Sequence, residues 1–373
     1  MVANRDWRLA LSDVPRELFI PELIWVEDER VGGYVAMWRS EDPGLWAQLV
    51  AADGVVVTQV DDGSTPPGSV GRSPSGSSSK PSIVASMLHA LDLQPGHAVL
   101  EIGTGTGWNA ALLCEGVGKT GRVVSVEIDA ELAAAARTAL AQAGYRATVV
   151  TADGTGGYPP GAPYDRTMST AAVRQRVPWA WVQQTRPGGL IVTPWGTSYH
   201  NGTQIRLEVT DDNTATGRFG GNLAFMQLRT QRGPSWVDNE DLDGSDSGKT
   251  TLSSPEIGQA VAGFDGSFAV GLHVPDCRVH VEEDVADSRH LVWLSDGQSL
   301  ARVVVDVGGS AHQVHQRGPR RLWDEVESAY IWWRDAGQPH HTRFGVTVTP
   351  GNQVIWLDDP ANTVPAARCV TTP

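Results

Sequence analysis

The chain has 373 residues, enough for two or three domains, and 40% of them are hydrophobic, which suffices for a substantial core. A formal net charge of -14 without a visible cluster of Lys and Arg argues against nucleic acid as a partner, because such a surface repels phosphates. No apolar run reaches membrane-spanning length and charges interrupt the N-terminus, so neither a membrane segment nor a signal peptide is predicted. Three scattered cysteines offer no disulfide framework and no zinc spacing, which favours a cytoplasmic location.

Residues 1–78 are interpreted as an N-terminal segment that ends in a mobile loop. Fifteen of the 21 residues from 61 to 81 are Gly, Ser or Pro, a composition that disfavours regular structure. We expect this stretch to act as a lid over a substrate. The alternative is a disordered tether without a function.

Residues 79–230 are predicted to form a doubly wound α/β domain with a mainly parallel sheet, a Rossmann-like fold. Strands are expected at 98–103, 122–128, 147–152, 165–170 and 189–194, with helices near 107–116, 130–143 and 176–185. Two further strands flank the turn at 211–217 and are expected to pair antiparallel at the sheet edge.

The most informative stretch runs from Ala98 to Asp129, where a strand, a glycine-rich turn, a helix and a second strand follow one another. This arrangement is typical of a nucleotide-like cofactor site. Glycines occupy every second position from Gly103 to Gly107, whereas a dinucleotide fingerprint also requires Gly or Ala at position 108. Trp108 stands there instead, which argues against a pyrophosphate cradle. The E-x-G-x-G-x-G pattern resembles the first motif of S-adenosylmethionine (SAM) methyltransferases.

Two carboxylates follow the next strands of this domain. Glu127 ends the second strand, where it can accept hydrogen bonds from both ribose hydroxyls. Asp153 and Gly154 follow the third strand and can receive the adenine edge; for this pair alone, an ordinary β-turn is the alternative. The predicted cofactor-binding residues are Glu101, Gly103, Thr104, Gly105, Gly107, Glu127, Ile128, Asp153 and Gly154.

The remainder of the chain is divided into two parts. Residues 231–260 are acidic and rich in Gly and Ser, and are predicted to be a linker or a surface loop. Residues 261–373 are expected to form a small α+β domain that binds a substrate peptide. Its helix near 320–337 has apolar residues at a three-to-four spacing, which predicts one buried face: Leu322, Val326, Tyr330 and Trp333.

Two histidine pairs raise the question of a metal. His312 and His315 form one pair, and His340 and His341 form the other. Neither pair has an acidic or cysteine partner at ligand spacing, so both are interpreted as surface residues and no metal site is predicted.

Between about Val14 and Trp195, roughly half of its length, the chain resembles the protein L-isoaspartate O-methyltransferases. The resemblance is carried by VPRELFIP, VLEIGTGTGWNAALL, VVSVEID, TADGTGGYPPGAPYD and STAAVRQRVPWAWVQQTRPGGLIVTPWG. It implies a SAM-dependent carboxyl O-methyltransferase with S-adenosylhomocysteine as the product of the cofactor. A carboxylate with a pKa of about 4 is already ionised at neutral pH, so the absence of an obvious general base is expected.

The family also has a T-I-S-x-P motif, whose serine helps to orient the substrate carboxylate. The matching residues here run from Ser77 to Pro81, which puts Ser79 in the place of that serine. The resemblance therefore implies that Ser79 is the catalytic residue. The alternative is that Ser79 caps a helix that starts near Pro81.

Two departures from the family suggest a specialised acceptor. Repair enzymes usually continue with histidines after the proline, whereas this chain has Ser82, Ile83 and Val84. The C-terminal LWDEVESAYIWW, RFGVTVTP and VIWLDDP resemble the tail of methyltransferases encoded with ATP-grasp ligases or lanthipeptide synthetases. This branch implies that the enzyme esterifies an Asp side chain of a ribosomally made, graspetide-like peptide that is already cross-linked. The ester would then close to an aspartimide.

Two other functions are kept as alternatives. One is a protein-L-isoaspartate (D-aspartate) O-methyltransferase that repairs damaged proteins. The other is a non-catalytic peptide-binding protein of the same fold, against which the intact glycines, Glu127 and Asp153 speak.

Overall fold

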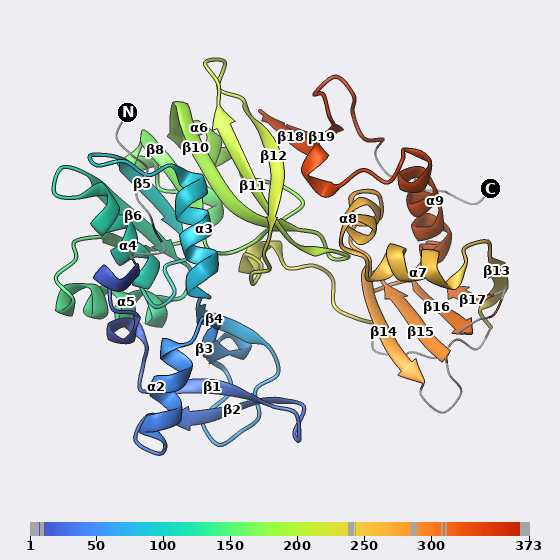
Figure 1. The fold of residues 1–373 in the computed structure, drawn as a ribbon, viewed down its shortest axis with the longest axis horizontal. Coiled ribbons are helices and arrows are strands. Elements are labelled where there is room, and N and C mark those ends of the chain that lie inside the picture. The colour runs from blue at the N-terminus through green and yellow to red at the C-terminus, as the bar shows by residue number, and fades with distance from the viewer. Residues whose placement is uncertain are drawn as a thin grey trace.

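The computed structural model describes residues 7, 11–237, 242, 244–284, 289–306, 309 and 312–365. Within these residues the strands form three sheets (Figure 1). A four-stranded sheet lies in an N-terminal lobe, a ten-stranded sheet forms the centre, and a five-stranded sheet lies in a C-terminal domain. Residues 238–241, residue 243 and Cys369 were included in sequence predictions and lie outside the described residues.

The N-terminal lobe is an antiparallel sheet of order β2-β1-β3-β4, covered by one helix. Its elements are η1 (Leu11–Asp13), η2 (Arg16–Phe19), β1 (Leu23–Asp28), β2 (Gly33–Trp38), α2 (Pro43–Ala51), β3 (Val56–Val60), η3 (Asp61–Gly63) and β4 (Pro74–Ser78). Trp46 and Val50 of α2 pack on Ile24 and Val56 of the sheet.

The prediction that residues 61–78 end in a mobile loop is wrong for the last part of this stretch. Residues 74–78 form β4, which pairs with β3 in the register Val56 to Ser78. The segment before β4 is fixed by Asp61, whose carboxylate accepts hydrogen bonds from the backbone nitrogens of Arg72 and Ser73 at 2.9 and 2.8 Å. Composition missed this strand because its pairing partner, not its own side chains, determines its conformation.

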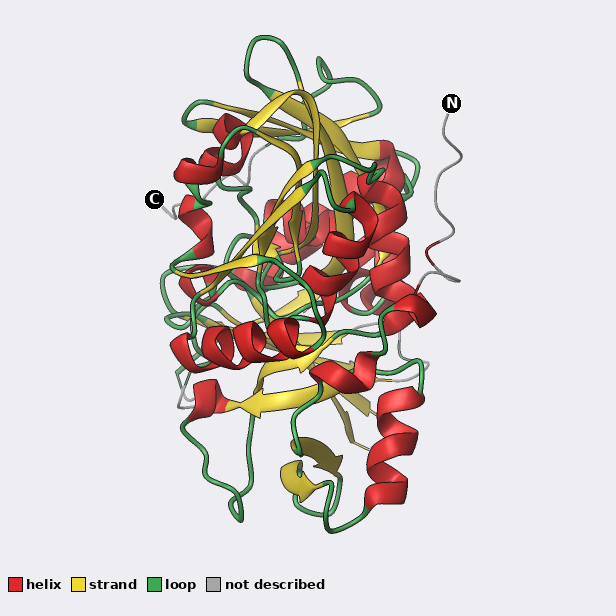
Figure 2. Ribbon diagram, turned by 90° about the vertical axis from the view of Figure 1, so that its left-hand side faces the viewer, coloured by secondary structure: helices red, strands yellow, loops and turns green. Residues whose placement is uncertain are grey.

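The central domain contains the predicted parallel sheet, which is confirmed, with strand order β10-β8-β5-β6-β7. Its elements are α3 (Pro81–Leu91), β5 (Ala98–Ile102), α4 (Trp108–Val117), β6 (Arg122–Glu127), α5 (Ala130–Gln142), β7 (Thr148–Thr151), η4 (Gly154–Gly156), η5 (Pro159–Gly161), β8 (Tyr164–Ser169), β9 (Val173–Arg174), α6 (Trp179–Gln184) and β10 (Thr185–Gly196). All five residues of β5 are buried. Val99 faces the helices α3, α4 and α5, whereas Leu100 faces α6, so the sheet is covered on both sides (Figure 2).

The central sheet continues into antiparallel strands: β11 (Asn201–Val209), β12 (Ala215–Asn222), β18 (Phe344–Thr349) and β19 (Asn352–Leu357). The predicted antiparallel pair around 211–217 is confirmed, but it does not lie at the sheet edge. β18 pairs with β12 and is itself followed by β19, so residues 344–357 belong to the central sheet. The predicted domain 261–373 is therefore corrected at its C-terminal end.

The C-terminal domain places three helices against a sheet of order β13-β17-β16-β15-β14. Its elements are β13 (Asp246–Thr250), α7 (Ser254–Val261), α8 (Phe264–His273), β14 (Arg278–Asp284), β15 (Arg289–Ser295), β16 (Leu300–Asp306), β17 (His312–Arg317), α9 (Leu322–Asp335) and η7 (His341–Arg343). The predicted apolar face of α9 is confirmed, because all four of its residues are buried. The prediction that residues 231–260 are a linker or a surface loop is also corrected, because β13 and most of α7 fall within this range.

The histidine pairs also need a correction. His312 is fully buried and His341 is 3% exposed, so these two are not surface residues. The ring Nδ1 of His341 lies 2.8 Å from a carboxylate oxygen of Asp265, which thereby connects α8 to the segment before β18. Ligand atoms of Asp265, His340 and His341 lie within 4.8 Å of one another. Asp265 and His340 are 75 positions apart in the sequence, so local spacing gave no signal of this cluster.

Candidate active site

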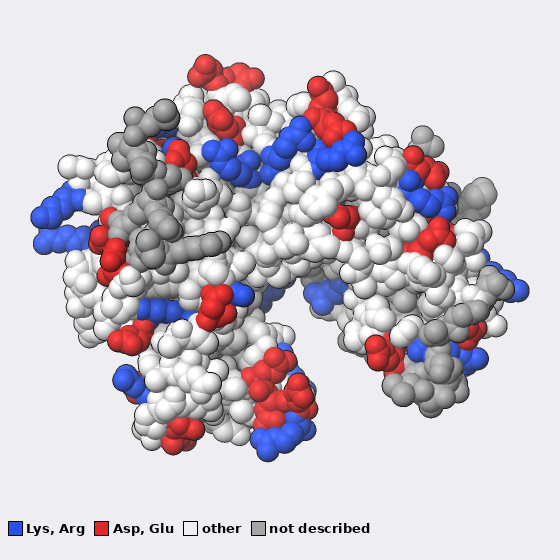
Figure 3. All heavy atoms as spheres, viewed as in Figure 1, with Lys and Arg blue, Asp and Glu red and all other residues white. Residues whose placement is uncertain are grey.

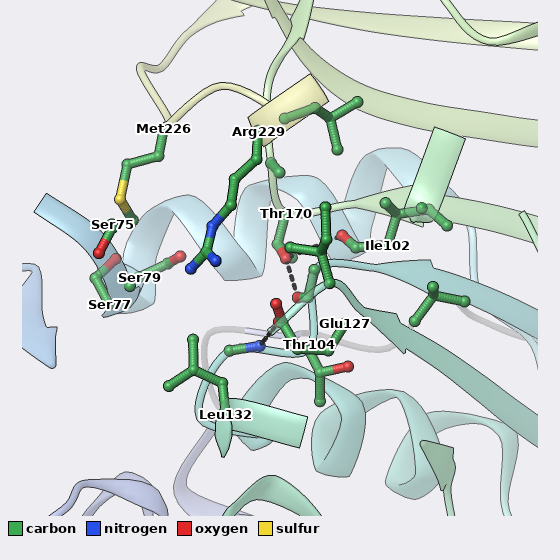
Figure 4. A pocket seen from close by; sticks show the side chains of 18 of the residues that line it. Ser75, Ser77, Ser79, Ile102, Thr104, Glu127, Leu132, Thr170, Met226 and Arg229 are labelled. Carbon is green, nitrogen blue, oxygen red and sulfur yellow. Dashed lines mark hydrogen bonds between the residues drawn. The ribbon is translucent and has the colours of Figure 1, made fainter. Parts of the chain in front are cut away.

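One pocket lies at the carboxyl ends of β5, β6 and β7, where the parallel strands of an α/β sheet place their ligands. Seven of the nine predicted cofactor residues line it: Gly103, Thr104, Gly105, Glu127, Ile128, Asp153 and Gly154. Ser79 lines the same pocket from the opposite side, together with the rest of the segment 75–79 (Figure 4). The structure thus brings the predicted methyl-donor side and the predicted acceptor side to one place.

The glycine turn has a backbone that only glycine adopts without strain. Gly103 has a φ of +90°, and a Cβ on it would lie 2.8 Å from the hydroxyl oxygen of Thr170. That hydroxyl donates to the carbonyl oxygen of Gly103 at 2.5 Å and fixes the turn from the end of β8. Gly107 has a φ of +88° and begins α4, which it brings close to Ala136 of α5. Gly107 is therefore a packing residue beside the pocket and does not line it.

The carboxylate of Glu127 is held under the turn. Its Oε2 accepts a hydrogen bond from the backbone nitrogen of Gly105 at 2.8 Å, and its Oε1 accepts one from Asp129 at 3.1 Å. A carboxylate has about four acceptor sites, so both oxygens keep capacity for a ligand in the pocket. The sequence predicted the ribose contact but not this second function, in which Glu127 stabilises the glycine turn.

Glu101 differs from its predicted position because it does not line the pocket. Its carboxylate is completely buried beneath the turn, where it accepts hydrogen bonds from Asn109 at 2.6 Å and from the hydroxyl of Ser125. Burial raises the pKa of Glu101 to about 7, although these two hydrogen bonds oppose the shift. The hydroxyl of Ser125 lies 2.5 Å from that of Thr104, which does line the pocket. Glu101 thus positions the turn through its neighbours.

The far end of the pocket is formed by Asp153 and by apolar side chains. The Oδ1 of Asp153 accepts a hydrogen bond from the backbone nitrogen of Thr155 at 2.9 Å, and the Thr230 hydroxyl lies 3.4 Å away. Ile128 and Leu132 supply apolar surface to the same pocket. A carboxylate for hydroxyls, apolar side chains for a flat ring and a second carboxylate for an amino group fit the adenosine part of SAM.

The acceptor side is anchored by Arg16, the arginine of the VPR motif. Arg16 is only 8% exposed, and its guanidinium donates to the Ser78 hydroxyl at 2.9 Å and to the carbonyls of Ser78 and Ser79 at 2.8 and 3.0 Å. It also donates to the carbonyls of Gly54 and Val50, at 2.9 and 3.2 Å. Burial lowers the pKa of Arg16 to about 10, so the group is still charged at neutral pH. The backbone of Ser79 is therefore fixed by a residue 63 positions away.

Ser79 precedes the helix α3 without capping it. The N-cap residue is Lys80, and the backbone nitrogen of Ser82 donates instead to the carboxylate of Asp53 at 2.8 Å. The alternative that Ser79 caps this helix is therefore wrong. Its side chain is left for the pocket that it lines.

Trp108 joins the two family motifs. Its ring is 3% exposed, and its Nε1 donates to the carbonyl of Val14 at 2.9 Å. The guanidinium of Arg16 lies 5.5 Å from the ring centroid, within the range of a cation–π contact. The tryptophan that argued against a dinucleotide thus connects the glycine turn to the VPR motif, a contact that the sequence did not predict.

Sequence reasoning also missed a set of ion pairs that joins two arginines of the pocket lining to the N-terminal lobe. Asp62 accepts two hydrogen bonds from Arg232, at 2.6 and 2.8 Å, and lies 3.1 Å from the Nε of Arg229. Arg229 also contacts the carboxylate of Asp129 at 3.1 Å and extends toward the segment of Ser79 (Figure 4). We refer to Asp62, Arg229 and Arg232 as the bridge. The three residues come from the N-terminal lobe and from the connection after β12, so no local motif contains them.

Known proteins are similar to the part of the chain that contains this pocket. Residues 67–231 match the family described as protein-L-isoaspartate(D-aspartate) O-methyltransferase. The protein-L-isoaspartate O-methyltransferase of Methanopyrus kandleri is 42% identical over 157 residues, which cover 42% of this chain and 69% of that protein. The enzyme of the same name from Thermococcus onnurineus is 44% identical over 159 residues, 42% of this chain and 70% of that protein.

A solved structure titled protein-L-isoaspartate O-methyltransferase has a similar fold over almost the whole length. It covers 95% of this chain and 96% of its own, with 20% identity and a TM-score of 0.53. The fold and pocket thus define a Rossmann-like methyltransferase. The chain belongs to the protein-L-isoaspartate (D-aspartate) O-methyltransferase family.

Family membership confirms three of the predictions. The protein is a SAM-dependent carboxyl O-methyltransferase, its cofactor is SAM, and its fold is the predicted Rossmann-like one. Among the residues that the structure describes, every helix is too short or too polar to span a bilayer. The cytoplasmic location and the individual site residues remain predictions.

Proposed function

We propose that this enzyme methylates the carboxylate of an L-isoaspartyl residue in a polypeptide. The observation that carries the proposal is that Ser79 and the glycine turn line one pocket. Relatives 42 and 44% identical to this chain are named for isoaspartate, and the matched family model covers both sides of the pocket. The predicted roles of Glu127, Asp153 and Ser79 are part of this proposal.

The chain's own residues would act by positioning. When bound, SAM supplies a sulfonium methyl group and leaves as S-adenosylhomocysteine. Ser79 donates a hydrogen bond to one oxygen of the acceptor carboxylate and turns the other oxygen toward the methyl group. The acceptor is already ionised at neutral pH, so the rate depends on alignment and on exclusion of water. Arg16 keeps the Ser79 backbone in place through the hydrogen bond to its carbonyl.

The methyl ester makes a later ring closure possible. The backbone nitrogen after the ester attacks the carbonyl carbon, the new C–N bond replaces the C–O bond, and methanol leaves. In a damaged protein, hydrolysis of the resulting succinimide restores an ordinary aspartyl residue in a fraction of the molecules. The same ring would be the final product in a maturation enzyme.

A second candidate function is methylation of an aspartate in a modified ribosomal peptide. The observation that favours it is Ile83, which lines an apolar cavity beside Ser79 where repair enzymes usually have a histidine. An ATP-grasp ligase or a lanthipeptide synthetase would then act on the precursor first. The C-terminal region does not support this function by itself, because a structure named for isoaspartate has a counterpart over 95% of this chain.

A pair of hexapeptides tests the proposal. Radiolabel from the methyl group of SAM should appear in an isoaspartyl hexapeptide and not in its aspartyl counterpart. If the radiolabel appears in a graspetide-like cyclic peptide and not in the isoaspartyl peptide, the result would favour the second candidate instead.

Replacement of Ser79 separates binding from transfer. Ser79→Ala should lower kcat/KM for the isoaspartyl peptide about tenfold to a hundredfold, because one hydrogen bond to a charged group is lost. Calorimetry measures whether the variant still binds SAM with the affinity of the wild type. Ser69→Ala is the matched control, since Ser69 is exposed in the same segment and does not line the pocket. Equal activity of both variants would remove Ser79 from the mechanism.

A further inference from the structure

Two cavities flank the acceptor side of the pocket. The first, of about 850 Å3, lies between the sheet of the N-terminal lobe and residues 222–226. The second, of about 740 Å3, lies between residues 225–227 and the strand β14 of the C-terminal domain. The surface is hollowed between the N-terminal lobe and the C-terminal domain (Figure 3), and the second cavity is lined by residues of both.

Each cavity shares lining residues with the cofactor pocket. The first shares Ser77, Ser79 and Met226 with it, and the second shares Met226, Gln227 and Arg232. Met226 thus lines all three spaces and marks their junction (Figure 4). A group placed at Ser79 for methyl transfer therefore borders the first cavity directly, and the second cavity meets the same pocket at Met226, Gln227 and Arg232.

The two cavities differ in chemistry. The first is lined mainly by apolar side chains, among them Trp25, Tyr34, Val55, Ile83 and Phe225. The second is lined by polar and charged groups that include Asn201, Arg232, Arg278, His280 and Glu282. Burial of an apolar side chain in the first space is favourable. The second space offers hydrogen-bond partners to a peptide backbone and to polar side chains.

We propose that these cavities are one substrate groove, which holds an extended polypeptide with the acceptor residue at Ser79 and an apolar residue beside the acceptor in the first cavity. The proposal rests on the proposed function. A typical small-molecule cavity has roughly 300 to 1,000 Å3, so each of these spaces could hold a ligand of that size by itself. Both cavities meet the pocket at Met226, which favours a chain that runs through them, because a small acceptor would use only one of them.

The groove has a consequence for specificity. An apolar side chain on one flank of the isoaspartyl residue should raise kcat/KM, since its burial in the first cavity adds binding that is lost for glycine. The second flank should tolerate polar residues. Trp25 and Tyr34 belong to β1 and β2, so the N-terminal lobe is assigned as the element that selects the sequence around the acceptor.

A series of isoaspartyl pentapeptides tests this. The residue before or after the acceptor is varied as Gly, Leu, Trp or Glu, and kcat/KM is measured with labelled SAM. We expect Leu or Trp at one of the two positions to exceed Gly by about tenfold or more. Equal kcat/KM across the series, with methylation observed, would overturn the groove and leave the proposed function standing. Absence of methylation from every peptide, with SAM bound in calorimetry, would overturn both.

A matched pair of variants locates the effect. Val55 is 59% exposed and lines the first cavity, whereas Val31 is 43% exposed in the turn after β1 and lies outside the cavities. Val55→Asp should reduce the ratio of the Leu peptide to the Gly peptide toward one, and Val31→Asp should keep it. Melting curves check that both variants fold. The same ratio in both variants would assign the selectivity elsewhere. Turnover of a small β-aspartyl amide with a free α-carboxylate, at the rate of the Leu peptide, would favour a small acceptor.

Discussion

The cofactor side and the acceptor side of the site are constructed in different ways. The cofactor side comes from residues 102–154, where consecutive parallel strands end at one edge of the sheet. The acceptor side combines the segment 75–79, residues 222–232 and the buried Arg16. In the first case the topology of one sheet places the groups, whereas in the second the placement depends on contacts over more than 60 positions.

This difference shows where each side is vulnerable. On the cofactor side, backbone groups of the glycine turn hold the polar side chains. One example is the hydrogen bond from the backbone nitrogen of Gly105 to the carboxylate of Glu127. On the acceptor side a single guanidinium, that of Arg16, holds the consecutive residues Ser78 and Ser79. Damage to the turn should therefore affect the cofactor first, and damage to Arg16 should affect the stability and the acceptor together.

The largest effect is expected from the glycine turn. Gly103→Val should weaken SAM binding about a hundredfold or more, because a positive φ and a clash with Thr170 together cost roughly 3 kcal/mol. Gly118→Val is the control, since Gly118 also has a positive φ but has open space around its Cβ position. Calorimetry with SAM should separate the two variants. Similar losses of affinity in both would mean that backbone strain in general, and not the shape of the pocket, is responsible.

The next largest effect is expected for Arg16. Arg16→Ala leaves several buried carbonyls without a donor and should lower the free energy of unfolding by about 3 kcal/mol. Arg30→Ala should change it within experimental error, because the pair of Arg30 with Asp28 is exposed. Urea unfolding measures both variants. If Arg16→Ala loses acceptor turnover but no stability, the guanidinium acts on the substrate and not on the fold.

A pH-dependent effect is expected from Glu101. Its pKa is about 7 in the folded protein against an ordinary value of 4.5, so between these values the folded state binds more protons than the unfolded state. The contribution of Glu101 to stability therefore falls as pH rises through this range, by on the order of 3 kcal/mol at most. Glu101→Gln cannot titrate, so its unfolding free energy relative to wild type should increase over the same range. A constant difference between the two proteins at all pH values would contradict this assignment.

The smallest effect is expected from the bridge. Asp62→Asn should weaken SAM binding about threefold, equivalent to roughly 0.5–1 kcal/mol, because Asp62 and Arg232 are partly exposed and screened by solvent. Asp211→Asn, in the turn after β11, makes the same charge change away from the pocket and is the control. Dissociation rates of SAM at low and high salt measure the difference. Identical rates would show that the bridge has no part in retaining the cofactor.

Much of the cofactor side could be read from the sequence, for a local reason. A strand of five buried residues, glycines at alternate positions and a carboxylate at the end of the next strand are all encoded within about 30 residues. The same local reading placed Glu101 and Gly107 in the pocket, where neither lies. Side-chain burial at a strand end depends on the layer above it, which the motif does not contain.

The predictions that failed concern pairings between distant segments. β4 lies in a stretch with the composition of a loop, and β18 and β19 return to the central sheet from the far end of the chain. His341 is buried because Asp265 and Phe264 pack on it, and both precede it by more than 70 positions.

The sequence by itself determined the methyl donor and the fold of the domain that binds it, because local backbone geometry and strand order are sufficient for that. Only the tertiary structure decided how the acceptor is presented. The backbone of Ser79 is held by Arg16. The neighbouring cavities are lined by residues from different parts of the chain, and the ion pair of Asp62 with Arg232 joins two further distant segments. These contacts form when segments far apart in the chain pack together, and a linear motif carries no information on that packing.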